Sequence, residues 1–197
     1  MKTIVERTLI TILLFSAFLT SAQGQFNADT EASILNWKGF KPTGDHYGTV
    51  KVKEGFFTVK DKQLVSGEFE IDMTSIVNLD MDADSEYNTK LVNHLKGDDF
   101  FSVEKYPVAS FKISKTEIKG DKTLITGDLS IKGKTHSVSF LASVKNEGKN
   151  LYVKSETFKI DRSKWDVKHQ SKSFFADLGD KFIYDDIELS FEVTAKQ

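Results

Sequence analysis

The sequence contains no cysteine and only two prolines. Without cysteine the chain can form no disulfide, carry no lipid on a cysteine side chain, and offer no thiol nucleophile or thiolate metal ligand. With so little proline it has no proline-rich linker between domains. We therefore expect a single domain that is held together by its hydrophobic core alone.

The chain also lacks a large net charge of either sign. Its 27 basic and 29 acidic residues give a formal charge of −2. Lysines alternate with acidic residues along most segments, whereas a surface that binds phosphates normally shows a basic stripe. The composition therefore predicts no nucleic-acid partner.

No apolar run is long enough to span a bilayer, which takes about 20 residues. The longest, Leu9–Leu19, follows Lys2 and Arg7 and precedes Thr20–Ala22, an arrangement typical of a cleavable secretory signal. We predict a signal peptide over residues 1–22 and one domain over residues 23–197. The mature protein is then expected to be periplasmic or secreted, with no stable membrane anchor.

Alternation of apolar and polar residues dominates the chain from Gln63 onward. In Val65–Met73 the odd-numbered positions are apolar or glycine, and Ile187–Ala195 alternates in the same way, which is the period of a half-buried strand. Further strands are predicted at Ser33–Gly39, Gly48–Lys53, Phe56–Lys60, Val108–Ile118, Lys122–Ile131, His136–Lys145 and Leu151–Ile160.

Eight or nine short strands joined by hairpins predict an all-β fold, with an antiparallel sheet that closes into a barrel or packs as a sandwich. The turns are expected at Lys119–Asp121, Lys132–Lys134 and Asn146–Asn150. Within Leu151–Ile160 the apolar positions change phase, which predicts a β-bulge near Ser155–Thr157.

Two segments depart from the strand pattern. Ser85–Lys96 has helical spacing, with Ser85 as its N-cap, and Leu91 and Leu95 are expected to pack this short helix onto the sheet. Asp161–Asp185 is irregular and rich in aromatic residues, so we expect it to cover another part of the molecule.

Candidate metal ligands do not form a recognisable motif. The histidines, His46, His94, His136 and His169, stand singly in the sequence, with no second ligand at the spacing of a zinc site. Asp80, Asp82 and Asp84 resemble the start of a calcium loop, but Ser85 and Leu91 occupy the positions that require glycine and glutamate. We predict scattered surface histidines, a solvated acidic loop and no metal site, so that metal is dispensable for stability.

Catalytic patterns are equally scarce. The sequence has no Gly-x-Ser-x-Gly elbow, and Asp161 and Arg162 beside Trp165 are interpreted as a structural ion pair. We therefore predict a protein that is not an enzyme and needs no cofactor.

Phenylalanine is the most abundant aromatic residue, with 16 against five tyrosines and two tryptophans. Rings without a hydrogen-bonding group suit a wall that contacts only hydrocarbon. An eight-stranded barrel is just wide enough either to fill itself with side chains or to hold one slender ligand. The amino-acid pattern leaves both alternatives open.

Three separated phrases occur in the order that is typical of one known family. They are His94–Phe101 (HLKGDDFF), Lys105–Phe111 (KYPVASF) and Gly127–Val138 (GDLSIKGKTHSV). With Gly67–Ile76 and Phe158–Trp165 they make the mature chain resemble the YceI-like family of secreted lipid-binding proteins.

This resemblance implies a closed, antiparallel, eight-stranded, lipocalin-like β-barrel with one short helix, which holds an isoprenoid or other long-chain lipid in an apolar pore. The implied function is sequestration or transport of that lipid, and a homodimer is left open. The alternative is a structural or interaction barrel with a self-filled interior that binds a partner through its loops. The expected ligand-binding residues are the in-phase apolar residues of the clearest strands: Phe69, Ile71, Phe111, Ile113, Leu129, Ile131, Phe140, Phe158, Leu189 and Phe191.

Overall fold

A computed structural model describes residues 23–197, so the predicted signal peptide, residues 1–22, lies outside the described residues. The strands are β1 (Gln23–Ala28), β2 (Ile34–Lys41), β3 (Gly44–Lys60), β4 (Gln63–Asn78), β5 (Val108–Lys119), β6 (Lys122–Ile131), β7 (Lys134–Glu147), β8 (Asn150–Ser155), β9 (Phe158–Asp161) and β10 (Asp186–Lys196). The helices are α1 (Glu86–Lys96) and the 3-10 turns η1 (Arg162–Trp165) and η2 (Gly179–Lys181).

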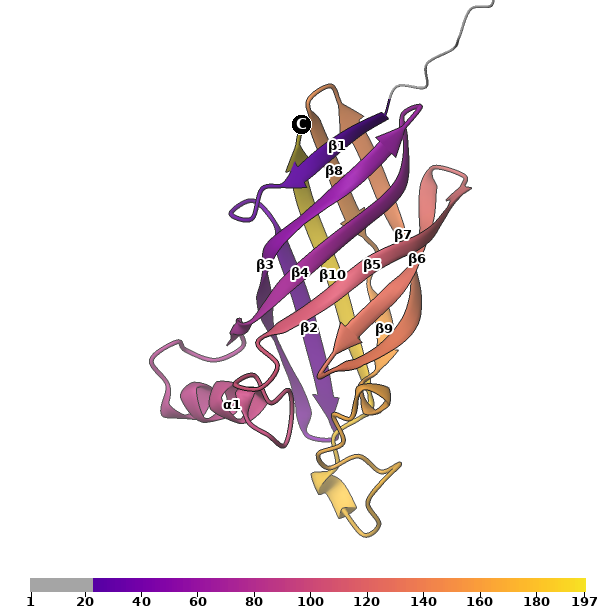
Figure 1. Cartoon of the computed structure of the whole chain (residues 1–197). Helices are drawn as coiled ribbons and strands as arrows, with labels where there is room; N and C mark the ends of the chain where they lie inside the picture. Colours follow the sequence, from indigo (N-terminus) through magenta and orange to yellow (C-terminus); the bar gives the residue numbers. More distant parts are fainter. Residues whose placement is uncertain (1–22) are drawn as a thin grey trace, which may run out of the picture.

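The strands form one antiparallel sheet that closes on itself as a ring of eight strand positions. Strands β3 to β8 are neighbours in chain order, with α1 in the connection between β4 and β5, and β10 closes the ring by pairing with both β8 and β2. β1 and β2 share one position between β3 and β10, and β8 and β9 lie along β10 one after the other. The predicted fold class, a closed antiparallel barrel with one helix, is confirmed (Figure 1).

Side-chain alternation sets which face of each strand is buried. In β4 the side chains of Phe69, Ile71 and Met73 are buried, whereas those of Glu68 and Thr74 are exposed. The prediction that Val65 shares this inward phase is wrong. The ladder between β3 and β4 shifts register next to Val65, so Leu64 turns inward and Val65 is 40% exposed.

The predicted hairpin turns are confirmed. Gly120 and Gly133 take φ values of +64° and +73°, a region that glycine enters without steric cost. The predicted bulge near Ser155–Thr157 is a complete break, since Glu156 and Thr157 belong to neither β8 nor β9. Leu151 and Ile160, on either side of the break, are both buried.

The two ends of the barrel differ. At the β1 end a cluster of buried side chains fills the interior; it includes Phe26, Leu64, Ile125, Leu151 and Ala195. At the opposite end, called here the α1 end, α1 and the loop of residues 162–185 lie beyond the strands (Figure 1).

Ser85 caps α1 by accepting a hydrogen bond from the Tyr87 amide, as predicted. Leu95 is buried in a second apolar cluster, with Leu91 packed against it.

Candidate functional site: an apolar pore

The barrel interior holds two apolar cavities, one after the other along its axis. The lower cavity, toward the α1 end, has a volume of about 160 Å³, and the upper cavity has about 80 Å³. Leu35, Ile71, Leu129 and Leu189 line both cavities and form the waist between them. The cavities are therefore consecutive sections of one pore, which ends at the filled β1 end.

All ten residues expected to bind ligand line this pore. Phe69, Ile71, Phe111, Ile113, Leu129, Phe140, Phe158, Leu189 and Phe191 line the upper cavity, and Ile131 lines the lower one. The period-two pattern brings them together because alternate residues of a barrel strand point inward. Their contact with a ligand stays a prediction.

Sequence reasoning missed much of the lower cavity. Its walls include Trp37 of β2, Met73 of β4, Phe100 after α1, and Ile183 of the 162–185 loop. Two signals were available: Leu91 and Leu95 mark the inner side of α1, and the phenylalanine pair Phe100–Phe101 follows the helix directly. The residues from the loop carry no periodicity that could have placed them.

Arg162 is a buried cation at the α1 end and lines the lower cavity. Its guanidinium donates hydrogen bonds to four backbone carbonyl groups, those of Val167, His169, Ile183 and Tyr184. Burial lowers the pKa of Arg162, and the negative charges of Asp185 and Asp161 oppose that effect. Arg162 therefore holds both ends of the 162–185 loop together at the pore mouth.

The prediction that Arg162 forms an ion pair with Asp161 is wrong. The carboxylate nearest to Arg162 is that of Asp185, with 3.4 Å between Nη2 and Oδ1. Asp161 instead accepts hydrogen bonds from the amide and the hydroxyl of Ser163 and so caps η1. Trp165 is buried, and its indole N–H donates to the Leu129 carbonyl.

A second polar pair lies at the lower cavity. His46, which lines that cavity, has its Nδ1 2.9 Å from Oδ2 of Asp80, and the Tyr47 amide donates to Oδ1 of the same carboxylate. Burial alone would raise the pKa of Asp80, but these hydrogen bonds outweigh it and keep the pKa below its ordinary value. Asp80 is thus a structural group rather than part of a solvated acidic loop.

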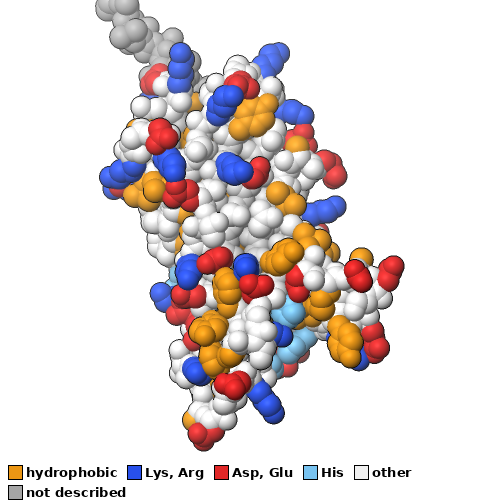
Figure 2. All heavy atoms as spheres, turned by 180° about the vertical axis from the view of Figure 1, so that it is seen from behind, with side chains coloured by type: hydrophobic (Ala, Val, Ile, Leu, Met, Phe, Trp, Pro, Cys, Tyr) orange, Lys and Arg blue, Asp and Glu red, His pale blue; other side chains and the backbone are white. Residues whose placement is uncertain are grey.

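The α1 end carries exposed hydrophobic side chains. Tyr87 and Leu79 are exposed near α1, and Phe174, Phe175 and Tyr184 are about half exposed on the 162–185 loop. Seen from behind, hydrophobic side chains gather at this end, with histidines among them (Figure 2). The irregular segment therefore extends beyond the barrel as well as covering its end.

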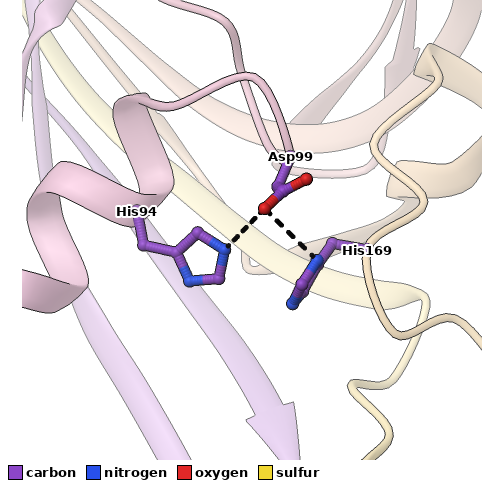
Figure 3. A group of neighbouring side chains, drawn as sticks. All are labelled: His94, Asp99 and His169. Atoms are coloured by element: carbon purple, nitrogen blue, oxygen red, sulfur yellow. Dashed lines mark ion pairs between the residues drawn. The ribbon is translucent and has the colours of Figure 1, made fainter.

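The sequence pattern predicted isolated surface histidines, but two of them lie together in the structure. His94 of α1 and His169 of the 162–185 loop lie with their ring centroids 4.7 Å apart, and Asp99 approaches both (Figure 3). Burial lowers the pKa of His169, with a further contribution from His94, while Asp99 opposes the shift. Their separation of 75 residues in the sequence hides this proximity.

The fold and pore define a class of protein: a closed lipocalin-like barrel with an apolar interior and one filled end. None of the helices in residues 23–197 has the length and apolar character that crossing a membrane requires. The YceI-like domain model matches residues 26–195, and the chain belongs to that family. The resemblance seen in the sequence is confirmed.

Relatives and solved structures agree with this assignment. A UPF0312 protein of Photorhabdus laumondii is 30% identical over 146 residues, which cover 74% of this chain and 72% of the relative. The crystal structure of BcnA from Burkholderia cenocepacia superposes with a TM-score of 0.65 at 21% identity and covers 86% of this chain and 99% of BcnA. A polyisoprenoid binding domain from Saccharophagus degradans, implicated in plant cell wall breakdown, gives a TM-score of 0.62 at 14% identity over 87% and 97% of the two chains. At these identities the two structures show the common fold.

Proposed function

We propose that this protein binds one long, isoprenoid-like lipid in its pore and carries it through an aqueous compartment outside the cytoplasm. The observation that carries the proposal is the unfilled apolar pore, with cavities of about 160 and 80 Å³ that share wall residues at the waist. Isolation of a lipid from the protein would be the direct proof.

The pore is better suited to hydrocarbon than to water. One water needs about 10–15 Å³ of such space together with two to four polar partners, and the walls here are almost entirely apolar. A lipid chain that enters the pore gains about 25 cal/mol for each Å² of apolar surface removed from water. Enclosure in the barrel is therefore a mechanism for solubilising an apolar chain without any chemical step.

The asymmetry of the pore supports one orientation of the lipid. The β1 end is filled by side chains, whereas Arg162 and His46 border the lower cavity. We propose that the apolar tail points toward the β1 end and the polar end of the lipid stays near the α1 end. The predicted signal peptide supports a site of action in the periplasm or outside the cell, and the related polyisoprenoid binding domain supports the lipid class.

The alternative, a self-filled barrel that binds a partner through its loops, is less well supported. Side chains fill the β1 end, but they leave two cavities in the middle and lower parts of the barrel. Catalysis is not part of the proposal.

The test is solvent extraction of protein purified under native conditions from a bacterium that makes isoprenoid lipids, followed by mass spectrometry. We expect a near-stoichiometric long-chain lipid. A matched pair of variants makes the result specific. Ala109→Phe places a ring in the lower cavity, which Ala109 lines, and Val65→Phe adds the same ring at an exposed position.

Ala109→Phe should fold and lose most of the lipid, and Val65→Phe should retain it. If extracts of folded wild-type protein contain no lipid, or if both variants retain the same amount, the pore is not the binding site.

A further inference from the structure

Three potential metal ligands from two separate segments converge on the surface at the α1 end. His94 lies in the last turn of α1, Asp99 follows that helix, and His169 belongs to the 162–185 loop (Figure 3). One ligand atom from each of the three side chains lies within 4.8 Å of the other two. Oδ2 of Asp99 is 3.5 Å from Nε2 of His94 and 3.9 Å from Nδ1 of His169.

These distances are close to those of a coordination sphere. Ligand atoms about 2.1 Å from a tetrahedral zinc ion lie about 3.4 Å from one another. The two separations from Asp99, 3.5 Å and 3.9 Å, are slightly longer than that value, and all three ligand atoms lie within 4.8 Å of one another, so side-chain rotations are needed to enclose an ion. The side chains are 42%, 67% and 25% exposed for His94, Asp99 and His169, so an ion could reach them from solvent.

The surroundings hold the two imidazoles in place. Both histidine rings contact Phe100, with centroid distances of 4.9 Å for His94 and 5.3 Å for His169. The carbonyl of His169 accepts a hydrogen bond from Arg162, whose positive charge is offset by Asp185. The two imidazoles thus pack against a buried ring, and a buried guanidinium holds the backbone of His169.

We propose that His94, Asp99 and His169 form a binding site for a divalent transition-metal ion of the zinc type, with water completing the coordination. Two imidazoles and one carboxylate match the ligand preference of such ions, whereas calcium and magnesium prefer oxygen ligands alone. An ion bound here would join the end of α1 to the 162–185 loop, directly over Phe100 of the lower cavity wall. None of the three ligand residues lines either cavity, so metal binding here requires no bound lipid.

The test is isothermal titration of the tag-free, EDTA-treated chain with zinc chloride, supported by the visible absorption spectrum of the cobalt(II) form. We expect one saturable equivalent of zinc. His94→Ala, Asp99→Asn and His169→Ala should each weaken binding more than tenfold. Zinc should raise the melting temperature of the wild-type protein but not that of the three site variants, since a ligand that binds the folded state stabilises it.

His136→Ala is the matched control because it removes an exposed histidine that lines neither cavity and lies outside the three-residue cluster. It should leave zinc affinity within twofold of the wild type. Thermal melts without metal check that every variant is folded. The proposal is overturned if the wild type shows no saturable binding, or if the three site variants bind zinc as the wild type does.

Discussion

At the scale of single residues, Phe140 is the centre of the upper pore wall. Its ring lies 4.5 Å from that of Phe158, 5.2 Å from Phe191 and 5.5 Å from Phe111, measured between centroids. Four rings from β5, β7, β9 and β10 thereby enclose one section of the pore. The width of that section depends on how much volume these rings occupy.

Phe111→Ala and Phe140→Ala should enlarge the upper pore. In lipid-free protein we expect each to cost about 3–5 kcal/mol of unfolding free energy, because a ring packed in the pore wall is replaced by a cavity. In protein purified with lipid, the loss should be smaller and the bound chains longer or bulkier than in the wild type. Denaturant unfolding and lipid mass spectrometry measure both effects.

Phe174→Ala, at a half-exposed position on the loop, is the control for this pair and should change neither quantity by much. A stability loss in the pore variants combined with the absence of lipid in every preparation would favour the self-filled barrel instead.

The residues of the pore were predictable where strands supply them. In β5 and β6, alternation alone assigns Phe111, Ile113, Leu129 and Ile131 to one face, and that face is the interior. Residues such as Trp37 and Ile183 were missed for two different reasons. Trp37 lies in a strand with a weak apolar alternation, and Ile183 reaches the pore only through the fold of a loop.

At the scale of elements, the 162–185 loop depends on Arg162. Replacement by lysine keeps the charge but cannot reproduce a planar guanidinium that donates to four carbonyl groups. Arg162→Lys should leave buried carbonyls without partners and cost about 2–4 kcal/mol.

Hydrogen exchange should show the loss of protection concentrated in residues 166–185, while β3 to β7 stay protected. Lys164→Arg, an exposed change in the same turn, is the control. Uniform loss of protection across the barrel would contradict a local role for Arg162.

Most elements followed from local patterns, and the exceptions have physical causes. β1 was not predicted because only Phe26 of its six residues is buried and the rest carry no apolar alternation. The segments predicted separately at Gly48–Lys53 and Phe56–Lys60 belong to one strand, β3, that is continuous through Gly55. A side chain at Gly55 would overlap the Phe69 ring, so this glycine serves close packing and not a turn.

At the scale of the whole molecule, we predict that the chain is exported. If residues 1–22 are a cleaved signal, intact mass spectrometry of exported protein should give a mature chain that begins at or near Gln23. Recovery of the chain with Met1 from the membrane fraction would contradict this. Substitution of Leu13 by arginine should block export by interrupting the apolar run, whereas Leu13→Ile should not.

Ring closure by β10 has a consequence for how the chain folds. β10 pairs with β2, about 150 residues earlier, as well as with β1, β8 and β9, and it is the last of the described strands to be synthesised. Contacts between such distant segments form slowly, because a long loop must close before they stabilise the structure. Until Asp186–Lys196 has left the ribosome, the nascent chain has unpaired strand edges and cannot form the barrel. A chain that folds only after its synthesis is nearly complete remains in the state that passage through a narrow translocation channel requires.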